Sequence, residues 1–121
     1  MPPSVLDLVQ RAAAVCVENK AVNVVVLDLR GVSDMTDYFV IASGTSDTHV
    51  RALGEHVLEE LRRLGARAHH VEGLAQGRWV LLDFVDFVVH AFHPALRDFY
   101  QLERLWGDAG VVPLRAQGAG A

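Results

Sequence analysis

GRWVLLDFVDFVVHAFH, residues 77–93, is the stretch that decides the fold. Its composition predicts two short strands that meet at a turn at Phe84–Val85. Side chains alternate between the two faces of a strand, so this hairpin has two different faces. One face is entirely apolar and is predicted to be core: Val80, Leu82, Phe87, Val89 and Ala91. The other face mixes an aromatic ring, two carboxylates and an imidazole: Trp79, Leu81, Asp83, Asp86, Val88 and His90.

The cross-strand partners on the mixed face depend on the register of the hairpin. A two-residue turn places Asp83 opposite Asp86 and Trp79 opposite His90. Val85 suits such a turn poorly, because a β-branched residue rarely adopts the positive φ that glycine takes readily. A longer or bulged turn would change the partners, but residues that share a face within one strand would still share it.

Length, composition and charge place the chain among single-domain globular proteins. It has 121 residues, which suit one domain, and its 51% of hydrophobic residues exclude a disordered chain. The single cysteine, Cys16, excludes an intramolecular disulfide and suits the reducing cytoplasm, where we expect the protein. We expect no secretory signal and no membrane span. A net charge of −4 argues against a bare nucleic-acid ligand and leaves a basic protein partner open.

The remaining segments predict an α/β domain. We expect a first helix at 4–19, which starts at Ser4 with Asp7, and then strands at 22–29 and 38–42. A second helix follows, which is capped by Thr45 or Ser46 and ended by Gly65. A strand at 68–71, the hairpin and a last helix at 95–106 complete the order. This order predicts a mixed five-stranded sheet with helices mainly on one face, which leaves the other face partly open. We expect the domain at residues 1–107 and a C-terminal tail at 108–121, flexible at its end.

The turn Ser43–Ser46, between a strand and a helix, has two interpretations. A helix N-terminus offers free N–H groups and positive potential, so the turn could hold a phosphate. It lacks the lysine and the glycine spacing of a P-loop, however. A tight turn that ends in an N-cap explains the same residues.

The carboxylates Asp83 and Asp86 also have two interpretations. Together they could bind magnesium, because hard cations prefer carboxylate oxygens. A glycine–serine turn followed by carboxylates on a later strand is typical of nucleotidyltransferases, so a magnesium-dependent enzyme of that kind is the alternative function. That chemistry usually needs an Asp-x-Asp pair soon after the turn, and none follows Gly44. As hairpin-end residues, the two carboxylates would instead be solvated or accept hydrogen bonds from turn N–H groups.

The six histidines do not form a recognisable metal motif. His69 and His70 are adjacent on a strand and point to opposite faces, and His49 and His56 lie two helical turns apart. We therefore expect no metal and no cofactor. His90 is either a recognition group or a half-buried structural imidazole.

Four segments, taken in order, resemble the ribosomal silencing factor family, also called Iojap-like. They are DMTDYFVIASGTSDTHV (34–50), VEG (71–73), the stretch 77–93, and RDFYQLERLWGD (97–108). The resemblance runs from about Val5 to Trp106. Its most specific residues are Asp37, Ser43, Gly44, Thr45, Ser46, Glu72, Gly73, Trp79, Asp83, Asp86, His90, Arg97, Phe99, Tyr100, Leu102, Glu103, Leu105 and Trp106. The chain departs from the family at Val85, where members commonly have glycine.

The resemblance implies a regulator of translation and not an enzyme. Members bind the large ribosomal subunit through ribosomal protein L14, block joining of the small subunit and repress translation, notably when nutrients are scarce. It also implies a fold similar to a nucleotidyltransferase core without catalytic carboxylates, a homodimer when free, and no membrane or sequence-specific nucleic-acid partner. We expect the partner-binding residues to be Trp79, Leu81, Asp83, Phe84, Asp86, His90 and Tyr100.

Overall fold

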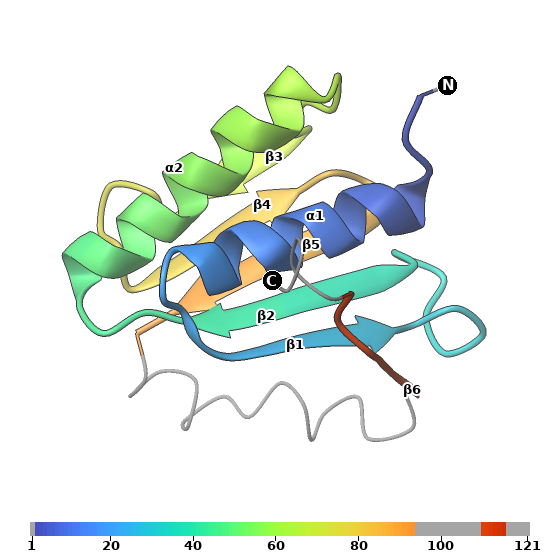
Figure 1. The fold of residues 1–121 in the computed structure, drawn as a ribbon, viewed down its shortest axis with the longest axis horizontal. Helices are drawn as coiled ribbons and strands as arrows, with labels where there is room; N and C mark the ends of the chain where they lie inside the picture. Colours follow the sequence, from blue (N-terminus) through green and yellow to red (C-terminus); the bar gives the residue numbers. More distant parts are fainter. Residues whose placement is uncertain (1, 94–109, 116–121) are drawn as a thin grey trace.

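Six strands and two helices form the part of the chain that the computed structural model describes, residues 2–93 and 110–115 (Figure 1). They are α1 (Val5–Glu18), β1 (Val22–Asp28), β2 (Tyr38–Ser43), α2 (Asp47–Arg63), β3 (His70–Glu72), β4 (Trp79–Asp83), β5 (Phe87–Phe92) and β6 (Gly110–Val112). The strand order is β3-β4-β5-β2-β1-β6. β2 and β5 are parallel, and all other neighbours are antiparallel. The predicted mixed α/β domain is confirmed.

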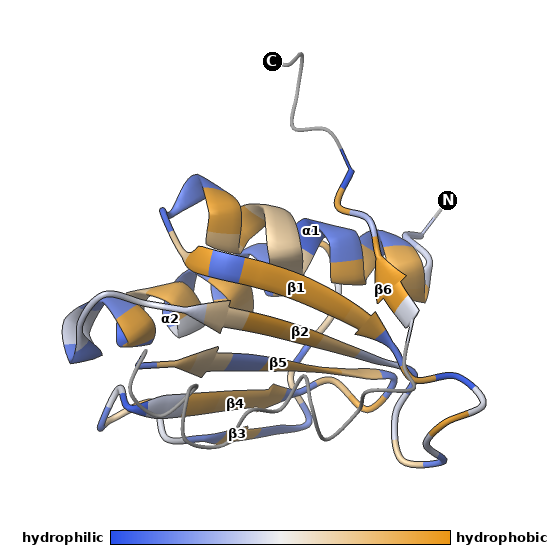
Figure 2. Ribbon diagram, turned by 90° about the horizontal axis from the view of Figure 1, so that it is seen from below, coloured by the Kyte–Doolittle hydropathy of each residue, from blue (hydrophilic) through white to orange (hydrophobic). Residues whose placement is uncertain are grey.

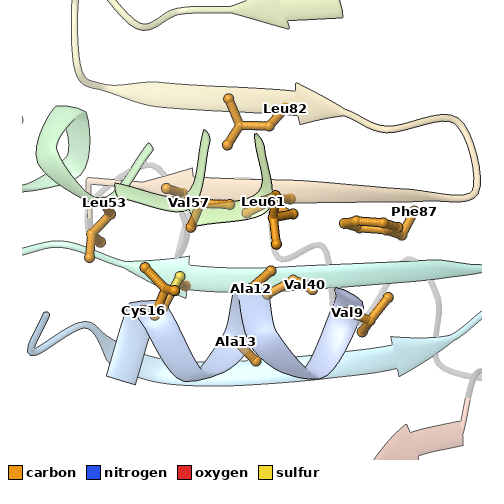
Figure 3. Packing of buried hydrophobic residues seen from close by; sticks show 14 of the residues in the cluster. Val9, Ala12, Ala13, Cys16, Val40, Leu53, Val57, Leu61, Leu82 and Phe87 are labelled. Atoms are coloured by element: carbon orange, nitrogen blue, oxygen red, sulfur yellow. The ribbon is translucent and has the colours of Figure 1, made fainter. Parts of the chain in front are cut away.

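Both described helices cover the same face of the sheet, as expected (Figures 1 and 2). Their buried side chains recur at spacings of three and four, so that each helix presents one apolar stripe to the strands. Figure 3 shows this core, to which α1 contributes Val9, Ala12 and Cys16, and α2 contributes Leu53, Val57 and Leu61. Burial raises the pKa of the Cys16 thiol to about 12, so Cys16 is an inert core residue. Neither described helix is long and apolar enough to cross a membrane.

The helices begin and end where local signals predict. The Ser4 hydroxyl accepts a hydrogen bond from the Asp7 N–H, and the Asp7 carboxylate accepts one from the Ser4 N–H, each at 3.0 Å. Ser46 caps α2 by accepting from the His49 N–H at 3.1 Å. Gly65 follows α2 with a φ of 93°, which glycine adopts without strain. The helix expected at 95–106 lies outside the described residues.

The hairpin formed by β4 and β5 has the predicted faces but a different register. Trp79 pairs with Phe92 and Asp83 with Val88, so the expected pairs of Trp79 with His90 and of Asp83 with Asp86 are wrong. The shift is two residues and therefore moves no side chain to the other face. The apolar face, from Val80 to Ala91, is buried under the helices, as predicted.

The turn that goes with this register is centred one residue later than predicted, because Phe84 belongs to the helix-side core, where its ring stacks on Phe87. Val85 has a φ of 73°, a left-handed conformation that is unusual for a β-branched residue. The Phe84 N–H donates to the Phe87 carbonyl oxygen, and the Asp86 N–H donates to the Phe84 carbonyl oxygen, both at 2.9 Å. Val85 and Asp86 are thus the central residues of the turn, one position beyond the predicted Phe84–Val85.

Two strands differ from the prediction. β3 spans His70–Glu72 in place of 68–71, because its extent is set by pairing with β4. The sheet has six strands and not five, because residues 110–112, which we assigned to the tail, pair antiparallel with β1 as β6.

Gln10 ties the segment after β6 to α1. Its side chain is buried, donates to the Pro113 carbonyl oxygen at 2.9 Å and accepts from the Arg115 N–H at 3.0 Å. The Arg115 guanidinium also reaches the Asp7 carboxylate at 2.8 Å. Backbone groups of this segment therefore complete their hydrogen bonds through one amide of α1.

Replacing Gln10 with methionine should loosen this tie. Methionine keeps the length of the side chain but cannot bond to Pro113 or Arg115, so we expect a loss of about 1–2 kcal/mol in the free energy of unfolding. Urea denaturation measures the loss, and hydrogen exchange should show a faster Arg115 N–H. Gln76→Met, at an exposed position, is the matched control. Equal stability and exchange in both variants would contradict the role of Gln10.

Candidate functional site

A second apolar cluster lies on the sheet face opposite the two helices. Its buried members are Leu27, Leu29, Ile41 and Phe92, and Val25, Phe39 and Trp79 pack against it while partly exposed. We expected this face to be partly open. The structure leaves the cluster itself buried and exposes the face in part over β4 and β5, at Trp79, Leu81, Asp83 and Val88. This region contains most of the predicted mixed face.

Trp79 and His90 meet on this face, although they are not cross-strand partners. The Trp79 Nε1–H donates to the His90 Nδ1 atom at 3.2 Å. The indole packs on Phe92 with 4.8 Å between ring centroids, and Phe39 meets the imidazole edge-on at 4.6 Å. These contacts hold the half-buried Trp79 side chain in one orientation.

His90 is a buried, neutral imidazole. It is 5% exposed, and burial lowers its pKa to about 4. Because Nδ1 accepts from Trp79, the single ring proton of the neutral form belongs on Nε2. That atom is buried and has no hydrogen-bond partner in the part of the chain that the structure describes. The structure therefore shows a packed imidazole that retains one unused donor.

The other predicted site residues are not all on this face. Asp83 is on it, and its carboxylate accepts from the Val85 N–H at 2.8 Å. Asp86 is exposed in the turn. Phe84 belongs to the helix-side core, where its ring stacks on Phe87 with 4.8 Å between centroids. Tyr100 lies outside the described residues.

Asp83 and Asp86 have the geometry of hairpin-end residues. They are not paired across the ladder, and Asp83 is engaged with a turn N–H group. Residues 2–93 and 110–115 contain no group of three or more His, Cys, Asp or Glu side chains that could hold a metal ion. The magnesium interpretation thus gains no support from the described geometry.

Among the described residues, a smaller and a larger pocket border the mixed face. The first, of about 220 Å³, is lined mainly by Met35, Phe39, Leu81, Asp83, Val88 and His90. The second, of about 310 Å³, is lined by Glu72, Gly73, Trp79 and Leu81. Leu81 lines both and so lies between them. Sequence reasoning missed Met35 and Phe39, because only the parallel pairing of Phe39 with Val88 brings this part of the chain to the hairpin.

The loop before β4 positions Trp79. Gly73 has a φ of 77°, and a Cβ atom there would collide with the Trp79 carbonyl oxygen. Gly77 has a φ of 72°, and a Cβ atom there would collide with the Asp47 carbonyl oxygen at the start of α2. The Arg51 guanidinium also donates to the Ala75 carbonyl oxygen at 3.1 Å. The loop is therefore docked on α2, and this fixes where β4 begins.

The polar groups of the turn Ser43–Ser46 make hydrogen bonds within the fold. The Thr45 N–H donates to His49 Nδ1 at 2.8 Å, and the other ring nitrogen lies 2.7 Å from the Asn19 carbonyl oxygen at the end of α1. A Cβ atom on Gly44 would collide with Val50. The N–H groups of Thr45 and His49 are thus used within the fold, which favours the tight-turn interpretation over a phosphate cradle.

Sequence comparison decides the family of this chain. The model of the family described as "Ribosomal silencing factor during starvation" matches residues 2–119. A Bacillus subtilis protein named ribosomal silencing factor RsfS is 39% identical over 108 residues, which are 89% of this chain and 92% of that protein. The chain belongs to the ribosomal silencing factor family.

Other relatives of this silencing-factor chain agree with the assignment. A crystal structure of a protein from Chromobacterium violaceum matches with a TM-score of 0.84 and 33% identity, covering 96% of this chain and 95% of that one. A mouse protein named mitochondrial assembly of ribosomal large subunit protein 1 is 38% identical over 74 residues, 59% of this chain and 32% of that protein. The resemblance seen in the four sequence segments is confirmed.

Gly73→Ala should destabilise the protein more than Gly31→Ala. Both glycines have positive φ, but a Cβ atom on Gly31 would meet nothing within 4 Å. We expect Gly31→Ala to cost about 1–2 kcal/mol from backbone strain. Gly73→Ala should cost about 1–3 kcal/mol more, because its Cβ overlaps the backbone of Trp79. Urea denaturation compares the two variants, and tryptophan fluorescence reports a change around Trp79. Equal costs would mean that the close approach at Gly73 is unimportant.

His90 should make the protein less stable as the pH falls from 7 to 5. The folded pKa of about 4 lies below the unfolded value of about 6.5, so the unfolded chain binds the proton first. The stabilisation by neutral His90 is complete above the unfolded pKa and is lost as the pH falls toward 4, roughly 2 kcal/mol of it by pH 5.

Urea denaturation of His90→Phe at several pH values tests this dependence. The substitution should flatten the slope between pH 7 and 5, although it also removes the acceptor for Trp79 and lowers the stability at every pH. His56→Phe, on the exposed side of α2, is the control and should keep the wild-type slope. If the free energy of unfolding of His90→Phe depends on pH as that of the wild type does, unfolding does not change the pKa of His90.

Proposed function

We propose that this protein binds the large ribosomal subunit through ribosomal protein L14, blocks joining of the small subunit and so represses translation. The observation that carries the proposal is the partly exposed Trp79 on the mixed face, within a chain of the ribosomal silencing factor family. The names of its relatives describe ribosomal silencing and, in mouse, assembly of the large subunit. A steric block of this kind needs a shaped surface and no bond-making group.

The mixed face has the properties of an interface anchor. Interfaces depend on a few well-packed aromatic side chains surrounded by polar groups, and tryptophan is enriched among them. Trp79 is already held by Phe92 and His90, so ordering it on binding costs little entropy. Leu81 adds apolar area, and Asp83 adds a carboxylate beside it. Docking of this face would therefore use groups that the fold has already arranged.

The charge of the protein suits a basic partner. The chain has a formal net charge of −4, Asp83 is at the hairpin end of the mixed face, and Asp86 is exposed in the adjacent turn. Opposite charges accelerate the encounter of two proteins and suppress incorrect partners. We propose that this protein acts in the cytoplasm without a cofactor and forms a homodimer when free, as the family resemblance implies. On this proposal, Asp86 and Tyr100 also contribute to the partner-binding surface.

Trp79→Ala should weaken binding to large subunits. Truncating a central aromatic anchor typically costs about 2 kcal/mol or more, which weakens binding roughly thirtyfold. Co-sedimentation with purified large subunits at low salt measures the fraction bound. Circular dichroism verifies the fold, because the substitution also removes packing against Phe92.

Val17→Ala is the matched control for this experiment. Val17 is an exposed apolar residue on α1, away from the mixed face, and its truncation should leave the bound fraction unchanged. Wild-type protein that stays in the supernatant would refute the proposed function. Wild-type binding that Trp79→Ala does not weaken would exclude Trp79 from the docking surface.

A further inference from the structure

The pocket beside Trp79 combines apolar walls with polar side chains, among which His90 has a buried nitrogen without a partner in the described residues. Its apolar walls are Met35, Phe39, Leu81 and Val88, which come from β2, β4, β5 and the loop before β2. Its polar lining is Ser33, Thr36, Asp83 and His90. The first three are engaged within the fold, because the Ser33 hydroxyl accepts from the Met35 N–H, the Thr36 hydroxyl donates to the Val85 carbonyl oxygen and the Asp83 carboxylate accepts from the Val85 N–H. A group that enters the pocket therefore meets hydrocarbon surface and an imidazole.

The size of the pocket favours a side chain over a small-molecule ligand. Its volume is about 220 Å³. Sites for cofactors and other small molecules usually enclose about 300–1,000 Å³. A water molecule occupies roughly 30 Å³ of the liquid, so the pocket has room for about seven waters or for one large amino-acid side chain. The occupant that fits is one residue of a protein partner.

The unused donor of His90 indicates a ligand with an acceptor atom. Its Nε2 atom is buried and has no partner among the described residues, while Nδ1 accepts from Trp79. Native proteins rarely leave a buried polar group unsatisfied, and each case calls for an explanation such as a functional role. A neutral imidazole in this tautomer can donate one hydrogen bond to an oxygen. A backbone carbonyl next to an inserted side chain supplies such an oxygen.

The pocket has an exposed apolar residue in its lining, Met35, and an exposed, strained turn residue next to it, Val85. Met35 is 88% exposed and Val85 is 56% exposed, although both are apolar. The Thr36 hydroxyl donates to the Val85 carbonyl oxygen at 3.1 Å, which links the loop of Met35 to the hairpin turn. Val85 has a positive φ, and strained backbone of this kind clusters at functional sites. Met35 would lose water when a partner covers the pocket.

We propose that this pocket receives one apolar side chain of the ribosomal partner, and that His90 Nε2–H donates a hydrogen bond to a backbone carbonyl oxygen of the same partner segment. The inference rests on the proposed function and names the residue that determines specificity at that surface. Trp79 has a second role as a positioning residue, because its Nε1–H holds the proton of His90 on Nε2. A segment without an accessible carbonyl beside its apolar side chain would leave the donor buried and unpaired.

Two substitutions of His90 distinguish the role of Nδ1, which accepts from Trp79, from the role proposed for Nε2. In His90→Asn the amide oxygen takes the approximate place of Nδ1 and can still accept from Trp79, but no atom reaches the place of Nε2. In His90→Gln the longer amide can place an N–H near Nε2. Removal of one hydrogen bond to a buried acceptor should weaken binding of purified L14 roughly tenfold in His90→Asn. His90→Gln should recover part of that loss.

Isothermal titration with purified L14 measures these affinities, and thermal unfolding shows whether each full-length variant is folded. His56→Asn is the matched control at an exposed histidine and should bind as the wild type does. Met35→Ser changes the lining of the pocket at an exposed position, where unfolding is not expected, and should also weaken binding. This variant keeps the proposal testable if His90→Asn does not fold.

Nitrogen NMR of the histidine side chains detects the hydrogen bond itself. In the free protein the Nε2 resonance of His90 should show a protonated nitrogen without an acceptor. On titration with L14 its proton should shift downfield, which a merely structural imidazole would not do.

The outcomes distinguish this inference from the proposed function. If wild-type protein binds neither L14 nor large subunits, the proposed function fails and the inference fails with it. If wild-type protein binds L14, but His90→Asn and Met35→Ser bind equally well and the Nε2 proton does not shift, the inference alone is overturned. Weaker binding of both variants, partial recovery in His90→Gln and a downfield shift would establish it.

Discussion

The parallel pairing of β2 with β5 is the constraint on which the rest of the structure depends. It joins the first half of the chain to the hairpin through a continuous register from Tyr38–Phe87 to Ser43–Phe92. On the helix side it closes the main core, and on the other side it places Phe39 beside Val88 and His90. Parallel neighbours need a long crossover, which α2, β3 and β4 provide. The mixed face therefore exists because two distant segments share one ladder.

Local sequence signals predicted the elements well, but not the way in which some of them pair. The Ser4 and Ser46 caps and the apolar stripes identified both described helices, because these signals act within a few residues. The hairpin faces were also correct, since alternation is a property of each strand. The register was wrong by two residues, because it was counted from a turn at Phe84–Val85, whereas Phe84 belongs to the helix-side core and the turn centres on Val85 and Asp86. β6 was missed, because a three-residue strand owes its order to β1 and Gln10 and not to its own composition.

The candidate site was partly predictable for the same reason. Trp79, Leu81 and Asp83 lie on one strand, so their shared face follows from sequence alone. Phe84 was expected beside them, but it points into the helix-side core. Met35 and Phe39 come from another part of the chain, and only tertiary pairing reveals them. From the sequence, His90 could be either a recognition group or a half-buried structural imidazole. The geometry shows how one ring can serve both, with one nitrogen held by Trp79 and the other unused.

The hydrogen bonds between Gln10 and the segment after β6 have a consequence for synthesis of the protein. Until residues 110–115 have left the ribosome, β1 is an edge strand whose outer N–H and C=O groups lack β6, and the buried amide of Gln10 lacks Pro113 and Arg115. Exposed edges of this kind are templates for pairing with other chains. A chain that lacks residues 110–115 would thus expose the unpaired backbone groups of β1, which β6 covers in the folded protein. The pairing of β6 with β1 and the hydrogen bonds of Gln10 therefore act together to protect this edge against aggregation.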